Sequence, residues 1–171
     1  MTARNHIRHI RQGFAVLFAA ALLVTATASC NHVDDTRVPN APVNLVFRGQ
    51  QSWDVYGVHG ALDSRRFIKD LHEPAGFFYA VSDYTGFGGL LLVADYYGNP
   101  VVYDLCCPVE CKRDIRVFVN DSHEAECPVC HSTYAVFENF GTPLSGVAAE
   151  RGFGLTRYRI TASGADRVIT R

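Results

Sequence analysis

The stretch VVYDLCCPVECKRDIRVFVNDSHEAECPVCHSTY, residues 101–134, holds five of the six cysteines of the chain. They form two clusters, each of which contains a Cys-Pro pair and lies beside a β-like run. A hairpin that joins the two clusters would place four sulfurs around one point. That is the geometry of a metal site, a cluster site or a disulfide knot.

Four of these cysteines have a spacing that suits a metal. Three residues separate Cys107 from Cys111, and two residues separate Cys127 from Cys130. Tetrahedral zinc accepts four thiolates from two such turns, and Cys-x-x-Cys places both sulfurs on one side of a tight turn. We therefore predict a four-cysteine site, with Cys106 as the spare thiol because successive side chains of a strand point in opposite directions. The spacing alone also allows Cys106 to replace one of the two ligands predicted in the first cluster.

The segments around the cysteine clusters predict an all-β domain, a small sandwich or barrel. Short apolar, β-branched and aromatic runs recur along the chain, with Gly, Pro, Asn or Asp between them, and the hydrophobic and charged fractions of 48% and 19% are those of a soluble globular protein. Residues 62–72 predict a short helix or an irregular segment. The expected strands cover residues 43–48, 53–58, 77–81, 90–95, 101–105, 115–119, 134–137, 155–160 and 167–170.

The first thirty residues differ from the rest of the chain. Three arginines precede an apolar run of 11 residues at 14–24, and small residues follow up to Cys30. The run is too short to span a bilayer as a stable helix, so we interpret residues 1–29 as an export signal. The ending ATASC at residues 26–30 resembles a bacterial lipoprotein signal, in which cleavage leaves a lipid-bearing cysteine. The alternative is ordinary secretion with Cys30 in the mature tail.

These features predict where the protein acts and what it contacts. Acyl chains on Cys30 would hold it at a membrane surface, so we expect a lipid-anchored, extracytoplasmic protein of the cell envelope. Residues 30–42 predict a flexible tether before a domain at 43–171. The mature chain has 13 basic residues (16 minus the 3 of the leader) against 17 acidic residues, a formal charge of −4. No basic stripe remains, so nucleic acid is not an expected partner.

Four motifs follow one another between residues 89 and 160: VYD at 102–104 before the first Cys-Pro, CPVCHSTY at 127–134, GTPLSG at 141–146 and LTRYRI at 155–160. With these motifs the region resembles a Rieske-type domain, the small β-fold that carries a [2Fe-2S] cluster on two loops. The resemblance implies that Cys107 and Cys127 are the cysteine ligands of the family. It also implies that Ser132 and Tyr134 supply hydroxyls that hydrogen-bond to sulfur and raise the reduction potential.

Both histidine ligands of that family are missing. Val109 stands at the first histidine position and Cys130 at the second. A Rieske centre needs two imidazoles on one iron, so we do not expect one here. Cys111 would then supply the missing ligand of a four-thiolate site. His131, which is offset by one position, is interpreted as a turn residue or an exposed side chain.

Two functions therefore stay open. The favoured one is a non-catalytic scaffold or interaction module that contacts an envelope protein and is held together by metal or disulfides. The alternative is an electron-transfer protein that carries a [2Fe-2S] cluster, and in neither case do we expect a stand-alone catalyst. The leader has no adjacent arginine pair, so we expect export of an unfolded chain that acquires its metal or disulfides outside. This favours zinc or disulfides over an iron-sulfur cluster.

Overall fold

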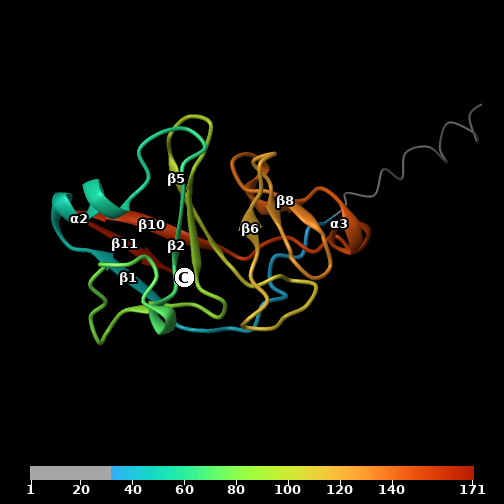
Figure 1. Cartoon of the computed structure of the whole chain (residues 1–171), viewed down its shortest axis with the longest axis horizontal. Helices are drawn as coiled ribbons and strands as arrows, with labels where there is room; N and C mark the ends of the chain where they lie inside the picture. The colour runs from blue at the N-terminus through green and yellow to red at the C-terminus, as the bar shows by residue number, and fades with distance from the viewer. Residues whose placement is uncertain (1–31) are drawn as a thin grey trace, which may run out of the picture. The chain divides into compact units, whose positions relative to one another are not determined.

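The structure, a computed structural model, describes residues 32–171 (Figure 1). The export signal predicted for residues 1–29 and the lipid-bearing Cys30 lie outside this range. Within it, the helices are too short to traverse a lipid bilayer.

The described chain forms two antiparallel sheets, and the predicted all-β class is confirmed. The larger sheet has the strand order β2-β4-β5-β10-β11-β1-β3, and the smaller has the order β6-β7-β8-β9. The strands of the larger sheet are β1 (Val43–Phe47), β2 (Ser64–Phe67), β3 (Tyr84–Thr85), β4 (Leu90–Ala94), β5 (Pro100–Asp104), β10 (Arg157–Ser163) and β11 (Asp166–Thr170). Those of the smaller sheet are β6 (Phe118–Val119), β7 (Ala125–Glu126), β8 (Thr133–Ala135) and β9 (Thr142–Pro143). The helical elements are α2 (Gly49–Tyr56), η1 (Lys69–Leu71), η2 (Asn139–Gly141) and α3 (Gly146–Arg151).

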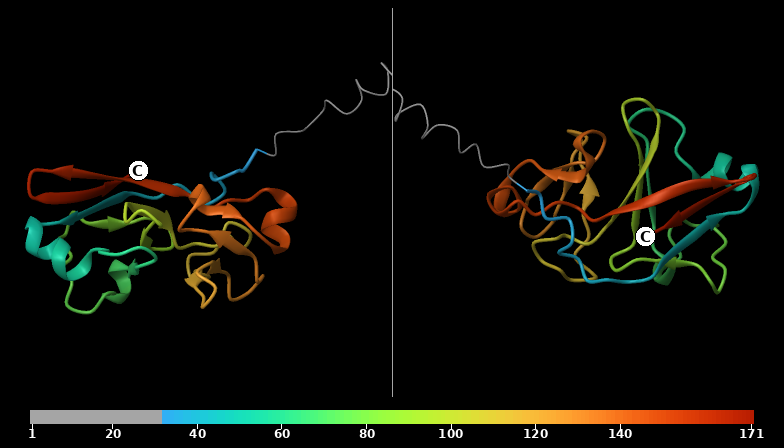
Figure 2. Two further views of the ribbon diagram at one scale, coloured as in Figure 1. Left: turned by 90° about the horizontal axis from the view of Figure 1, so that it is seen from above. Right: turned by 180° about the vertical axis from the view of Figure 1, so that it is seen from behind.

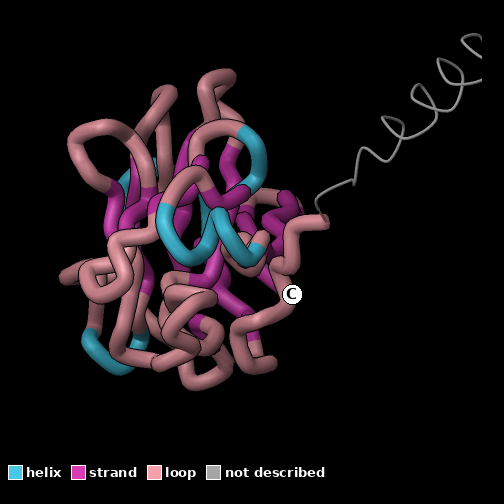
Figure 3. The backbone as a smooth tube through the Cα atoms, turned by 90° about the vertical axis from the view of Figure 1, so that its right-hand side faces the viewer, coloured by secondary structure: helices cyan, strands magenta, loops and turns pink. Residues whose placement is uncertain are grey.

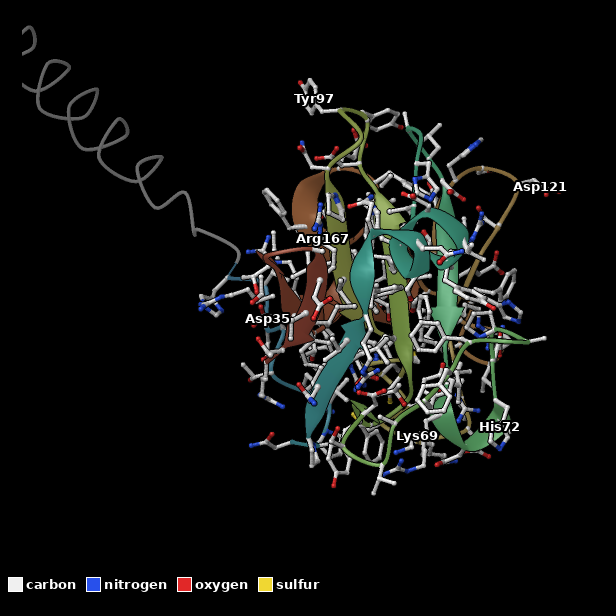
Figure 4. All side chains as sticks on the ribbon, turned by 90° about the vertical axis from the view of Figure 1, so that its left-hand side faces the viewer. Asp35, Lys69, His72, Tyr97, Asp121 and Arg167 are labelled. Atoms are coloured by element: carbon white, nitrogen blue, oxygen red, sulfur yellow. The ribbon has the colours of Figure 1, made fainter. Side chains whose placement is uncertain are left out.

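The larger sheet curls into a nearly closed barrel. Its two edge strands, β2 and β3, approach each other, and the backbone N–H of Lys69 just after β2 donates to Thr85 Oγ1 in β3 at 3.3 Å. Figure 2 shows the long β10–β11 hairpin running beside β1. Figure 4 views the barrel from the opposite side to the small sheet, with Tyr97 at the tip of the β4–β5 hairpin and Lys69 at the other end. Closure leaves few free strand edges, which protects a β-protein from edge-to-edge association.

Strand β4 is the wall that the two layers share. Its sequence LLLVA is apolar without alternation, and all five residues are buried. Because side chains alternate along a strand, Leu90 and Leu92 face the core of the barrel while Leu91 and Val93 face a second core beneath the small sheet. A continuous apolar run is what a strand buried on both faces requires.

The barrel core is built from aromatic rings. Phe47 meets Trp53 at a centroid distance of 5.1 Å and Phe67 at 5.2 Å, both edge to face. Phe77 closes the group at 5.4 Å from Phe47 and 5.2 Å from Phe67. Such pairs add about 0.5–1.5 kcal/mol each beyond the area that they bury. We call these residues and the apolar side chains around them the barrel core.

Three predicted segments differ from the structure. Residues 53–58, expected as a strand, lie mostly in helix α2, whose one buried residue, Trp53, fills the barrel core. Residues 77–81, also expected as a strand, form a loop in which Phe77 is buried while Phe78 is 75% exposed. Residues 62–72 contribute strand β2 before the short turn η1. In each of the first two segments, the large apolar residues reflect a side chain docked in the barrel core, Trp53 or Phe77, rather than a paired strand.

Residues 32–42 lie against the domain. Asp34 forms an isolated bridge with Phe153, and the hydroxyl of Thr156 donates to the carbonyl of Asp35 at 2.5 Å. Val38 is 2% exposed. The composition of this segment predicts a flexible tether, whereas its backbone contacts and the buried Val38 make it part of the folded unit from residue 32 onwards.

Candidate metal centre

Two short turns carry the cysteines to one end of the small sheet. Figure 3 is seen from the side of the molecule on which β8 and α3 lie in Figure 1. The first turn is CPVEC at residues 107–111, shortly after β5, and the second is CPVCH at residues 127–131, between β7 and β8. In the first turn the N–H of Cys111 donates to the carbonyl of Cys107 at 2.9 Å. In the second the N–H of His131 donates to the carbonyl of Cys127 at 3.0 Å. The two turns therefore close in the same way.

Three sulfurs meet between the turns. The Sγ atoms of Cys107, Cys127 and Cys130 all lie within 4.8 Å of one another. The Sγ atoms of Cys107 and Cys130, which come from different turns, are 3.6 Å apart. Cys107 and Cys127 are buried, and Cys130 is half-buried. We call these three residues the cysteine centre.

The other two described cysteines lie outside the cysteine centre. The Sγ of Cys111 sits 3.2 Å from the carbonyl oxygen of Pro108 and 3.5 Å from that of Arg37. The backbone of Cys111 is left-handed, with φ of 50°, and its Sγ is not among the ligand atoms that lie within 4.8 Å of one another. The structure thus brings together three of the four predicted ligands. Cys106, the predicted spare thiol, is fully buried, and its Sγ contacts the carbonyl of Lys112 at 3.4 Å.

Two hydroxyl side chains touch the cysteine centre. The Oη of Tyr134 lies 3.7 Å from Cys107 Sγ, and the Oγ of Ser132 lies 3.4 Å from Cys130 Sγ. The Ser132 oxygen also accepts a hydrogen bond from the backbone N–H of Ala148 in α3 at 3.1 Å, which fixes its position. Ser132 and Tyr134 are the two residues that the Rieske resemblance implies as sulfur partners, and the structure places both against cysteine sulfurs.

The three thiols differ in how readily they ionise. Burial raises the pKa of Cys107 to about 12, although the backbone N–H of Glu110 and the hydroxyl of Tyr134 oppose this. Burial also raises the pKa of Cys127. For Cys130, burial acts in the same direction but is outweighed by the hydroxyl and the backbone N–H of Ser132, so the pKa is lowered. Cys130 is therefore the thiol of the centre that most readily becomes a thiolate, the form that binds metals.

The buried carboxylate of Asp104 fixes the backbone just before the first turn. Asp104, the last residue of β5, accepts from the backbone N–H groups of Phe87, Gly88 and Cys106 at 2.8–2.9 Å, and from the hydroxyl of Tyr158 at 2.8 Å. The chain at Gly88 passes so close that a Cβ there would lie 2.4 Å from the N atom of Cys106. Sequence reasoning did not single out Asp104 as a positioning residue. Its signals were an acidic residue two positions before Cys106 and the glycine-rich turn that precedes β4.

His131 and Val109 take no part in the centre. The His131 side chain is 74% exposed, and its Nδ1 lies 3.3 Å from Glu126 Oε1. Val109 is partly buried against the core of the small sheet. Its side chain offers no donor atom for a metal.

Comparisons of this chain with protein-family models, with curated proteins and with solved structures found no match. The function is therefore argued from the cysteine centre itself.

Proposed function

We propose that this protein is an envelope scaffold or interaction module of Rieske-like fold whose cysteine centre binds one soft metal ion, with zinc as the preferred ion. The observation that carries the proposal is the convergence of three sulfurs from two turns within 4.8 Å. Thiolates are ligands that zinc accepts readily, and three protein ligands are enough to hold it.

The sulfur spacing favours a metal over a disulfide. Zinc–sulfur bonds of about 2.3 Å in a tetrahedral site place neighbouring sulfurs about 3.8 Å apart. A disulfide needs a sulfur–sulfur distance of about 2.05 Å. The Sγ atoms of Cys107 and Cys130 are 3.6 Å apart, close to the first value. The spacing therefore supports a bound metal, rather than a disulfide, between the two turns.

A metal here would act as a cross-link. Cys107 follows the barrel strand β5, whereas Cys127 and Cys130 belong to the β7–β8 connection of the small sheet. The strands of the small sheet have only two or three residues each. Such short ladders are marginal without further support. A structural zinc contributes about 10–16 kcal/mol of apparent binding free energy, which would secure the small sheet to the barrel.

The donor set also favours one metal ion over a [2Fe-2S] cluster. A cluster of that type takes four protein ligands. Among residues 32–171, three cysteine sulfurs are gathered, and Val109 at the family's histidine position has no donor. Electron transfer is kept as a second candidate because Tyr134 Oη and Ser132 Oγ lie against sulfurs. Hydrogen bonds to cluster sulfurs are a means of raising the reduction potential.

The proposed anchor is Cys30, through a lipid. The described chain begins two residues later, and its first eleven residues, 32–42, lie against the domain. An acylated Cys30 would therefore hold the domain close to a membrane surface, where an envelope protein would be its partner. Mass spectrometry of the intact protein from its host membrane tests the anchor, with an added diacylglyceryl group expected and an unmodified Cys30 contradicting it.

The metal is tested by elemental analysis of the full chain purified without chelators. We expect about one zinc per chain and no visible charge-transfer bands. Cys127→Ser should lose the zinc, whereas the matched control Cys111→Ser should keep it because that sulfur lies outside the centre. Iron near two per chain with visible absorption would support the electron-transfer candidate. A chain that holds neither metal would refute both.

A further inference from the structure

The two turns are variants of one structural unit. CPVEC and CPVCH share their first three residues. In each, the fifth residue is left-handed, with φ of 50° at Cys111 and 55° at His131, and its N–H closes the turn on the first carbonyl. Residues at the same position of the two turns can therefore be compared with each other.

In both turns the fifth residue lies outside the cysteine centre. His131 is 74% exposed and pairs with Glu126. The Sγ of Cys111 contacts the carbonyls of Pro108 and Arg37. The fifth residue of each turn therefore does not supply a ligand to a metal held by Cys107, Cys127 and Cys130.

The fourth position points toward the centre in the second turn, where it is Cys130. The equivalent residue of the first turn is Glu110. Glu110 is half-buried, and none of the ion pairs among residues 32–171 involves its carboxylate. Its oxygens lie outside the group of ligand atoms within 4.8 Å of one another, so its side chain must turn inward to reach a metal. A glutamate chain has the rotatable bonds to do so.

We propose that Glu110 supplies the fourth ligand, a carboxylate oxygen, to the metal held by Cys107, Cys127 and Cys130. This inference rests on the proposed function, since it needs a metal in the centre. It completes a tetrahedron in which each turn contributes its first and fourth residues. The first turn then gives sulfur and oxygen, and the second gives two sulfurs.

This ligand set makes the centre selective. Zinc is borderline in softness and accepts carboxylate oxygen as well as thiolate. Copper(I) selects soft sulfur ligands, so a glutamate oxygen suits it poorly. Three thiolates and one carboxylate also place four negative charges around the ion, which a divalent cation balances better than a monovalent one. The inferred site is therefore a zinc site rather than a copper(I) site.

The test is zinc X-ray absorption spectroscopy and zinc affinity of the full chain and three variants. Wild type should show three sulfurs at about 2.3 Å and one oxygen at about 2.0–2.2 Å. Glu110→Cys should show four sulfurs, because position 110 reaches the metal. Glu110→Gln should bind zinc at least about tenfold more weakly, since loss even of an outer partner costs 10–100-fold. Cys111→Ser, the matched control, should match wild type in both measurements.

Other outcomes overturn the inference in distinguishable ways. If Glu110→Gln keeps wild-type affinity and Glu110→Cys keeps the oxygen, the fourth ligand is water. If Cys111→Ser loses a sulfur from the coordination shell, the centre has four thiolates. If folded wild type takes up no zinc at all, the proposed function has failed before any variant is made. Fluorescence of Trp53, the single tryptophan of the chain, reports whether the barrel of each variant is folded.

Discussion

The barrel core and the cysteine centre lie on opposite faces of the same strand but are stabilised by different physics. The barrel core is a cluster of aromatic rings and aliphatic side chains from strands of four to seven residues and one helix. The core under the small sheet includes Cys107, Cys127 and Tyr134, and it lies between β4 and β5 of the barrel and the strands of the small sheet, which have two or three residues each. Burial of apolar side chains alone can stabilise the barrel core, whereas the core under the small sheet would gain stability from a cross-link. A metal bound in the cysteine centre, as proposed, would therefore stabilise the small sheet more than the barrel.

The largest effect should follow removal of the metal. Zinc is worth about 10–16 kcal/mol of apparent binding free energy in structural sites, but the barrel does not contain it. We expect chelation to abolish hydrogen-exchange protection in β7 and β8 while β4 and β5 stay protected. Native-state hydrogen exchange with and without chelator measures this. Equal loss of protection in both regions would mean that the two cores form one cooperative unit and that the metal does not act locally.

The next largest effect should come from the barrel. Phe67 is fully buried and contacts the rings of Phe47 and Phe77. Phe67→Ala should lower the free energy of unfolding by about 3–5 kcal/mol because it leaves a cavity. Phe78→Ala, at a residue that is 75% exposed, should change it by no more than about 0.5 kcal/mol. Urea titration gives both values, and zinc content should be unchanged. A loss of zinc in Phe67→Ala would instead couple the barrel to the centre.

A smaller effect is expected at the junction between the two regions. Asp104→Asn keeps the size of the side chain but leaves some of the four groups that donate hydrogen bonds to Asp104 without an acceptor. The free energy of unfolding should fall by about 1–3 kcal/mol. Since Asp104 also orients the first turn, zinc affinity should fall as well. Asp95→Asn, in the exposed β4–β5 turn, is the control and should leave zinc affinity intact. Unaltered zinc affinity in both variants would show that the turn holds its shape without Asp104.

The smallest effect should come from Tyr134→Phe, which removes one hydroxyl at 3.7 Å from Cys107 Sγ. Stability should fall by about 1 kcal/mol. The Tyr134 hydroxyl lowers the pKa of Cys107 against the larger effect of burial, so its loss raises that pKa. Zinc must displace the thiol proton, and the midpoint pH for zinc binding should therefore move upward. Zinc competition titrations between pH 5 and 8 measure the midpoint, and a downward move would contradict the assigned role.

Part of this architecture follows from local sequence patterns. Repeated short apolar runs with turn residues between them predicted an all-β domain, and the run at residues 90–95 predicted a strand, which the structure shows as the buried β4. The pattern failed at residues 53–58, where a tryptophan anchors a helix. Alternation over so few residues does not distinguish the period of a helix from that of a strand. The segment forms a helix that places Trp53 in the barrel core.

The candidate site divides in the same way. Cys-Pro pairs and the Cys-x-x-Cys spacing identified the two turns, and the family resemblance pointed to Ser132 and Tyr134. Spacing could not reveal that Cys111 lies outside the cysteine centre, where its Sγ contacts the carbonyl of Arg37 from a distant segment. Nor could composition show that residues 32–42 lie on the domain.

Local patterns are enough to predict the β-class and the two cysteine turns, because both depend on residues that are close along the chain. Three-dimensional contacts are needed to find which sulfurs meet, which thiol has a lowered pKa and how Asp104 joins the first turn to the barrel. Those depend on burial and on hydrogen bonds between segments far apart in sequence, which no local pattern encodes.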